Sequence, residues 1–264
     1  MSARGRSEII KLARLLGTEP SRFAYLVGLP DEDLRRLRHQ ATDVLFGANR
    51  VVFERIAAAS KLVPAAITAA IAQKAFGPLL CARVAGALEP ERAVDLAGRL
   101  PVAFLADVAA ELDPRRIGGV LTTLAPARIV AVAGELVRRA DFVTMGRFVG
   151  ELPSGLLRAT VVALPAEALL RTAVFSENDD RFPELFAMVT DDRIPSFVDV
   201  FATVDDELSA DLLPLLAYLD ETGLARMAAV VVDLAPGERA RFAAAASKAG
   251  LADRLGPLSA ALSA

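Results

Sequence analysis

Residues 89–136 read EPERAVDLAGRL PVAFLADVAAEL DPRRIGGVLTTL APARIVAVAGEL, four segments of 12 residues that each end in leucine. In each segment, apolar residues stand at positions i, i+3, i+4 and i+7, the spacing of one face of a short amphipathic helix. The first set is Ala93, Leu96, Ala97 and Leu100, and the next three begin at Leu105, Ile117 and Ile129. This stretch predicts short helices that recur along the chain.

The pattern continues toward the C-terminus with wider spacing. It resumes at Met145 and Leu157, fades around Leu169, and returns at Phe197, Leu212, Met227 and Phe242. Prolines stand one or two residues after the last leucine of a set, at Pro90, Pro101, Pro114, Pro126, Pro153 and Pro165. Proline fits the first turn of a helix and disfavours helix in the residue before it, so each one marks a stop and a restart.

Helices this short are below the ~12–15 residues at which an isolated helix becomes marginally stable in water. They persist only by stacking their apolar faces on neighbours, which is typical of an α-solenoid. No sustained period-2 alternation indicates a strand. The sequence therefore predicts an all-α fold, a right-handed superhelix of short amphipathic helices. We expect an N-terminal helical region at residues 1–88 and the repeat with C-terminal capping helices at 89–264, together forming one continuous unit.

The N-terminal region has a different character. Ser7 is predicted to cap a helix that stops at Gly17. Residues 51–88 are apolar on nearly all faces, which indicates either central burial, the reading we favour, or the lining of an apolar cavity. The candidates for lining such a pocket are Leu62, Ile67, Ile71, Phe76 and Leu80.

A family resemblance rests on Leu-x-Pro followed by a short amphipathic helix, as at Leu88-Glu-Pro and Leu112-Asp-Pro. Over about residues 85–205 this pattern resembles the cytoplasmic N-terminal domain of MgtE-type magnesium transporters, and it is similar to the helical repeats of the motor switch protein FliG. The resemblance implies a superhelix used for regulation or protein contact rather than catalysis. The transporters' regulatory domains and membrane pore have no counterpart in this sequence, so we expect no transport by it alone.

Composition excludes several classes of binding partner and metal site. The net charge of −3 gives no reason to expect a nucleic-acid partner. One cysteine excludes a disulfide framework and one histidine excludes multi-histidine metal sites. We find no apolar run of signal-peptide length near the N-terminus and no continuous run long enough to span a membrane, so a cytoplasmic location is expected. The basic residues Arg4, Arg6, Lys11 and Arg14 suggest a helix on a membrane surface, an alternative we do not favour.

Charge is concentrated in residues 176–221, which carry 13 acidic and two basic side chains. Asp179 with Asp180, and Asp191 with Asp192, are paired carboxylates 12 residues apart. They have three interpretations, of which we favour capping of helix N-termini. The others are a weak Mg²⁺ or Ca²⁺ site, since hard cations take oxygen ligands and the magnesium transporters use acidic surfaces of this domain, and a docking edge for a basic partner.

No catalytic constellation stands out. His39 lies in a basic segment and is expected on a solvated helix face, and Cys81 is expected to be a small buried apolar residue rather than a nucleophile. Gly118 and Gly119 indicate close helix packing rather than a phosphate loop. The sequence therefore predicts a non-catalytic protein without a cofactor, an interaction or regulatory scaffold with a protein partner. The alternative is a carrier or sensor of an apolar small molecule or lipid held inside the superhelix.

Overall fold

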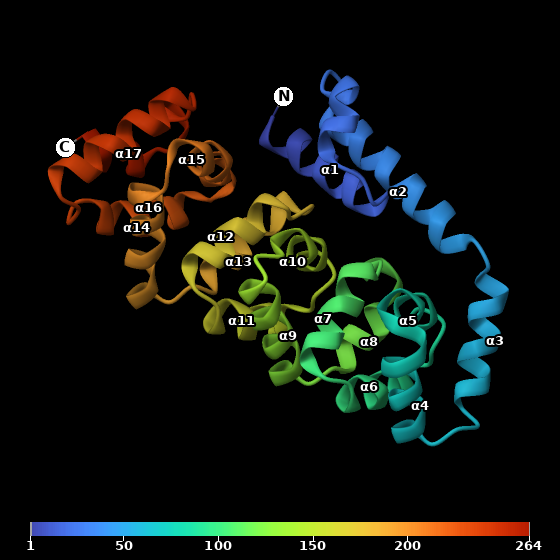
Figure 1. Ribbon diagram of the computed structural model, residues 1–264. Coiled ribbons are helices and arrows are strands. Elements are labelled where there is room, and N and C mark those ends of the chain that lie inside the picture. The colour runs from blue at the N-terminus through green and yellow to red at the C-terminus, as the bar shows by residue number, and fades with distance from the viewer. Residues whose placement is uncertain (1, 264) are drawn as a thin grey trace. The chain divides into compact units, whose positions relative to one another are not determined.

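The computed structural model describes residues 2–263, and none of them lies in a strand. The all-α prediction is confirmed (Figure 1). The chain divides into two compact units, Met1–Thr160 and Val161–Ala264. The two units meet inside the helix Ser154–Ala163. The boundary predicted at residue 88 therefore does not coincide with this division and lies within the first unit.

The first unit begins with α1 (Ala3–Leu15), a 3₁₀ segment η1 (Pro20–Leu26) and the long helix α2 (Asp31–Gly47). A middle set follows: α3 (Arg50–Ser60), α4 (Ala65–Ile71), the π-helical turn η2 (Ala72–Phe76) and α5 (Gly77–Ala85). Next come α6 (Pro90–Arg99), α7 (Val102–Glu111), η3 (Pro114–Arg116), α8 (Gly118–Thr123), α9 (Pro126–Arg138) and α10 (Phe142–Val149), with α11 (Ser154–Ala163) crossing the boundary between the units.

The second unit consists mostly of helices of six to thirteen residues. They are α12 (Ala166–Val174), α13 (Phe182–Ala187), α14 (Ile194–Thr203), α15 (Asp206–Leu212), α16 (Glu221–Val231), α17 (Pro236–Lys248) and α18 (Pro257–Ser263). The 3₁₀ turns η4 (Asp179–Arg181), η5 (Asp191–Arg193), η6 (Leu213–Tyr218) and η7 (Ala252–Arg254) connect them. The core of this unit is built from large side chains such as Phe242, Met227 and Leu255, all of which are inaccessible to solvent.

The helix starts predicted at prolines are confirmed. Pro90 and Pro126 are the first residues of α6 and α9, and Pro101 and Pro165 directly precede α7 and α12. Gly17 follows α1 with a φ of +63°, a conformation in which glycine carries no steric penalty.

The N-cap predicted at Ser7 is wrong. Ser2 caps α1 and accepts a hydrogen bond from the backbone N–H of Gly5 at 2.8 Å, whereas Ser7 lies buried inside the helix. A serine five residues further along offers the same local signal, and the tertiary burial of Ser7 has no signature in the neighbouring residues.

From α4 to α9 helices pack against the helix two places further along, whereas α10 packs against α9. α4 contacts α6 and α6 contacts α8, while α5 contacts α7 and α7 contacts α9. Ala93, Leu96 and Leu100 of the first apolar set are buried. A Cβ atom at Gly119 of α8 would lie 3.1 Å from Cγ of Pro90, so the close helix packing expected there is confirmed. At Gly118 a Cβ atom would meet nothing within 4 Å, so the same expectation is wrong for that glycine.

Arginine side chains hold successive helices together at their ends. In five places a guanidinium group donates to two carbonyl oxygens at the C-terminal end of a preceding helix. The donors and their acceptors are Arg92 on Ser60 and Val63, Arg128 on Ala97 and Leu100, Arg147 on Ala110 and Leu112, Arg193 on Val161 and Leu164, and Arg226 on Phe186 and Val189. We call these contacts the arginine clamps.

The clamps satisfy groups that a short helix leaves unpaired. The last four carbonyls of every helix lack a partner inside it, and a chain of short helices has many such ends. In three clamps the second acceptor is the residue before a proline: Val63, Leu100 and Leu164. Proline stops the helix there, and the planar guanidinium bridges the two exposed carbonyls with charge-assisted hydrogen bonds.

Removal of one clamp tests its contribution to stability. Arg128→Met keeps most of the aliphatic stem but leaves the carbonyls of Ala97 and Leu100 without their donor, so we expect a loss of about 2–3 kcal/mol. That loss lowers the melting temperature by roughly 4–12 °C in a protein of this size. The measurement is thermal and urea unfolding followed by circular dichroism.

Arg99→Met is the matched control, because Arg99 pairs with Asp95 across one turn of α6 and both side chains are exposed. We expect it to cost less than about 0.5 kcal/mol. Equal losses for Arg128→Met and Arg99→Met would contradict a stabilising role for the clamp.

Candidate binding surface

The apolar residues singled out in the middle set of helices lie at the surface of the first unit. Leu62 is 87% exposed, Ile67 53%, Ile71 41% and Phe76 42%, while Leu80 is half-buried. The expectation that residues 51–88 are centrally buried is therefore wrong. A role for these five residues in lining an enclosed pocket stays a prediction.

The inward face of α4 explains this exposure. Ala65 and Ala69 are one turn apart and pack into a buried cluster with Leu96 and Leu100 of the α6 region. Ile67 and Ile71 each follow an inward alanine by two residues, which places them about 200° around the helix from it. The small side chains of α4 therefore face the protein and its large side chains face outward.

The turn before α4 is fixed by the first arginine clamp. Arg92 donates to the carbonyl oxygens of Ser60 at 2.6 Å and Val63 at 2.7 Å, and to the hydroxyl of Thr68 at 3.2 Å. These bonds hold the end of α3 and the start of α4 against α6. Leu62 lies between the two clamped carbonyls and has no packing role, which accounts for its exposure.

The chain changes direction after α4 through η2. This turn is π-helical, and Gly77 follows it with a φ of +73°, a backbone conformation strained for any residue with a side chain. The Sγ atom of Cys81 lies 3.6 Å from the carbonyl oxygen of Ala72 across the turn. Burial raises the pKa of the Cys81 thiol, so it stays protonated near neutral pH. Phe76 and Leu79 are exposed on either side of the glycine.

Charge distinguishes this surface from the rest of the chain. Residues 50–85 contain five basic residues and one acidic residue, a net charge of +4, although the whole chain carries −3. Glu54 is already paired with Arg50 at 2.6 Å. We use the name α3–α5 surface for the exposed side chains of residues 50–85.

Ala65–Ala85 is the one helical stretch among residues 2–263 that is long and apolar enough to cross a membrane, and most of it is not buried inside the protein. Length and composition of a single helix are weak evidence for a span.

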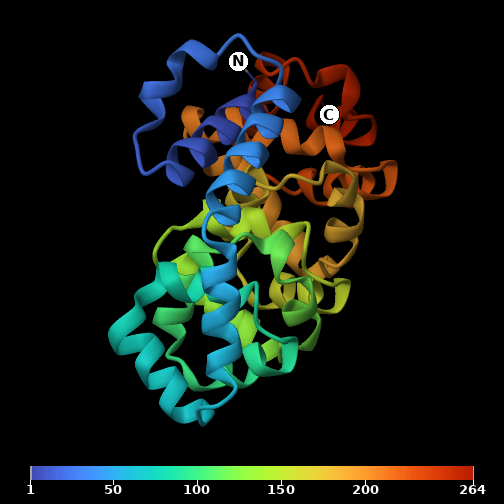
Figure 2. The same ribbon diagram turned by 90° about the vertical axis from the view of Figure 1, so that its right-hand side faces the viewer.

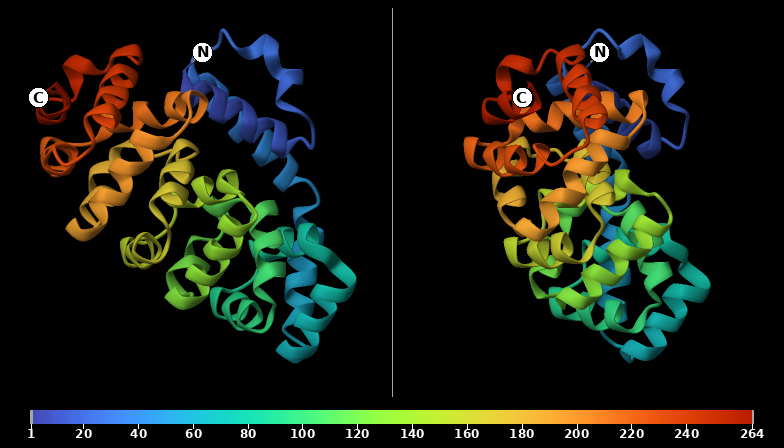
Figure 3. Two further views of the ribbon diagram at one scale, coloured as in Figure 1. Left: turned by 60° about the vertical axis from the view of Figure 1, so that its left-hand side comes forward. Right: turned by 90° about the vertical axis from the view of Figure 1, so that its left-hand side faces the viewer.

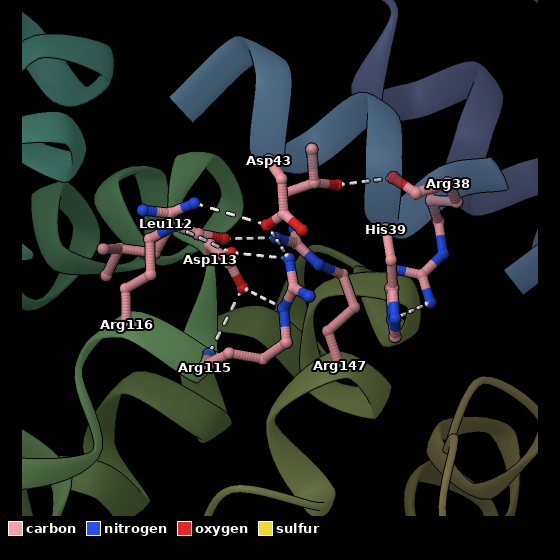
Figure 4. A network of polar contacts seen from close by, with 9 residues as sticks. Arg38, His39, Asp43, Leu112, Asp113, Arg115, Arg116 and Arg147 are labelled. Atoms are coloured by element: carbon pink, nitrogen blue, oxygen red, sulfur yellow. Dashed lines mark hydrogen bonds and ion pairs between the residues drawn. The ribbon is translucent and has the colours of Figure 1, made fainter. Parts of the chain in front are cut away.

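A polar network elsewhere in the first unit has a structural role (Figure 4). Asp113 is buried and accepts hydrogen bonds from Arg115 and Arg116, which both also reach Asp43 of α2. Burial raises the pKa of the Asp113 carboxyl. The hydrogen bonds and positive charge of Arg115, with a hydrogen bond from Arg116, together outweigh burial, so the pKa of Asp113 is below its usual value. The network joins α2 to the turn after α7, and both of its carboxylates already have cationic partners.

A second charged cluster is buried between α1 and α2. The Glu8 carboxylate accepts from Lys11 Nζ and from Arg38 Nε, both at 2.8 Å, and all three side chains are buried. His39 lies beside this cluster, with its Nε2 atom 3.1 Å from Nη2 of Arg38. His39 is thus half-buried against a charged cluster rather than fully solvated.

The acidic pairs of the second unit are not gathered into a cluster. Among residues 2–263, no group of three or more His, Cys, Asp or Glu side chains is arranged to hold a metal ion. Asp191 instead accepts from Arg226 at 2.7 Å. The structure gives no side-chain cap at η4 or η5, whereas Asp205 and Asp220 do cap α15 and α16. A cation shared by Asp179, Asp180, Asp191 and Asp192 stays a prediction.

No family model matches the chain, and neither a curated protein nor a solved structure matches it. The resemblance to MgtE-type and FliG repeats therefore rests on the sequence pattern alone.

Glu8→Gln tests whether the buried charge cluster is coupled to folding. Burial raises the Glu8 pKa, but Lys11 and Arg38 lower it more, so its folded pKa lies below its ordinary value of 4.5. The ionised carboxyl therefore stabilises the fold above about pH 4.5, and this contribution is lost as the pH falls through the folded pKa. At pH 7 we expect the variant to lose roughly 3–5 kcal/mol, since two cations stay buried without their counterion.

The measurement is urea unfolding of wild type and Glu8→Gln from pH 7 down to pH 3. The difference between the two proteins should shrink as the wild-type carboxyl becomes protonated. Glu54→Gln, at an exposed ion pair, should give a small difference that changes little with pH. A difference for Glu8→Gln that stays constant across this range would contradict the coupling.

Proposed function

We propose that this chain is a non-catalytic helical-repeat binding protein, an interaction scaffold that contacts its partner through the α3–α5 surface. The observation that carries this proposal is the orientation of α4, whose alanines face the protein while Ile67 and Ile71 face solvent. Exposed large apolar side chains that lie close together mark interaction sites, because covering them removes apolar surface from water and lowers the free energy.

The helix order supports a scaffold of the solenoid type. Contacts between helices two places apart from α4 to α9, together with clamps at helix ends, are what a stack of repeated units requires. Such a stack offers an extended surface without needing a catalytic cleft. Both Asp43 and Asp113 in the polar network are paired with arginines, which supports a structural rather than a chemical role for that network.

The exposure of Leu62, Ile67 and Phe76 favours an open contact surface over an enclosed ligand chamber. A small ligand held inside the protein would need apolar side chains that converge on one another. The partner is therefore proposed to be large enough to cover the surface from outside.

The test is retention of cell material on the immobilised protein. Wild type is compared with Ile67→Ser/Phe76→Ser and with the control Val162→Ser/Val232→Ser, whose valines are 58% and 49% exposed in the second unit. Each lysate is used with its membranes and again after detergent clearing. We expect wild type and the control to retain the same components in the same amounts. The Ile67/Phe76 variant should retain at least tenfold less of them.

All four substituted side chains are exposed, so melting temperatures should agree within a few degrees. Equal retention by the three folded proteins would contradict the proposed function.

A further inference from the structure

We infer that the α3–α5 surface docks on a lipid bilayer that contains anionic headgroups, with the large apolar side chains inserted at the level of the acyl chain boundary. This inference rests on the proposed function and names the partner of the same surface. It concerns peripheral docking of the folded protein.

The apolar part of the surface supplies the insertion. Its seven large side chains are at least 41% exposed: Val51, Val52, Leu62, Ile67, Ile71, Phe76 and Leu79. They come from three consecutive helices and the turns between them. α3 and α4 lie along an outer edge of the first unit, with the cyan segment that contains α4 projecting in Figure 2 and again in both panels of Figure 3.

The charged part of the surface supplies attraction to anionic headgroups. Arg55 and Lys74 are exposed and have no ion pair among the residues that the structure describes. Lys74 lies in the π-helical turn η2, three residues after Ile71 and two before Phe76, so its charge stands next to the exposed apolar side chains of α4 and η2 in the sequence. Arg55 follows Val51 and Val52 by four and three positions on α3. Lysine and arginine beside inserted apolar side chains are typical of helices that lie on membrane surfaces.

The charge of the surface argues against a second copy of the chain as its partner. A symmetric dimer through this surface would bring two positively charged regions together, since Arg50, Arg55, Lys61 and Lys74 are exposed there and Glu54 is the one exposed acidic side chain of residues 50–85. An anionic bilayer is complementary to that charge. The residues outside 50–85 carry a net charge of −7 and are repelled by anionic lipids. Such a bilayer therefore favours the orientation in which the α3–α5 surface faces it.

The inward packing of α4 favours docking over crossing of the membrane. Ala65 and Ala69 are buried against Leu96 and Leu100, and Arg92 binds the carbonyls on either side of the preceding turn. A spanning helix would break these contacts and bring the Arg92 guanidinium out of its site. Docking by the outward face keeps all of them.

The experiment is flotation of the full chain with vesicles of phosphatidylcholine alone and of phosphatidylcholine with 30% phosphatidylglycerol. We expect wild type to bind the anionic vesicles and to release from them at 0.5 M NaCl, where electrostatic attraction is screened. Arg55→Gln/Lys74→Gln should weaken binding about fivefold for each cation removed. Ile67→Ser/Phe76→Ser should lose most of the binding, and Val162→Ser/Val232→Ser should keep it.

Three results would overturn the inference: no flotation, equal flotation with neutral and anionic vesicles, or unchanged binding by the Ile67/Phe76 variant. A doubled mass in solution that the same variant abolishes would also overturn it in favour of a dimer. If vesicles do not bind but detergent-cleared lysate still gives variant-sensitive retention, the bilayer is excluded and the proposed function stands. If both readouts are insensitive to Ile67→Ser/Phe76→Ser, both proposals fail.

Discussion

The structure depends on arginine side chains that bind the carbonyl ends of short helices. A helix of ten residues leaves four of its carbonyls without an internal partner, so a chain of such helices has unpaired acceptors at every corner. Burying them without donors would cost about 1–3 kcal/mol each. Arg92, Arg128 and Arg147 in the first unit, and Arg193 and Arg226 in the second, supply these donors from a later helix. The same bonds join residues that are 28 to 40 positions apart in sequence.

This mode of attachment changes what the side chains of α4 must do. A helix held at its end by a clamp needs only a close-fitting inward face, and Ala65 and Ala69 provide one. The large side chains are then free to face outward, as Ile67 and Ile71 do. In the second unit the opposite arrangement holds, since Phe201 and Phe242 stack with ring centroids 5.6 Å apart inside the core. Helices of the second unit are clamped as well, by Arg193 and Arg226, so the exposure of Ile67 and Ile71 follows from the small inward face of α4 and not from the clamp alone.

The fold class and the helix starts could be predicted because they depend on local chemistry. The prolines at Pro90 and Pro126 start helices for reasons contained in two or three neighbouring residues. The orientation of α4 could not be predicted this way, because a segment apolar on all faces has no preferred inward side. The inward side is chosen by Leu96 and Leu100, which are some 30 residues away.

The arginine clamps have a sequence signal that the periodicity of apolar residues does not contain. Arg92 and Arg128 both stand two residues after a helix-starting proline, and two of their acceptors directly precede Pro64 and Pro101. The periodicity of apolar residues predicts which positions turn inward but ignores backbone carbonyls. Proline and arginine considered together would have identified these corners as points of attachment.

The outward orientation of α4 can be measured by the accessibility of thiols placed on its two faces. Ile67→Cys and Ala69→Cys, each in a Cys81→Ser background, place one thiol at a site 53% exposed and one at a site 5% exposed, two residues apart on the same helix. The reaction rate of each folded protein with a maleimide is compared with its rate in urea. The account predicts that the thiol at position 67 reacts nearly as fast folded as unfolded, while the thiol at position 69 is protected at least a hundredfold. Equal protection at the two positions, or stronger protection at 67, would contradict it.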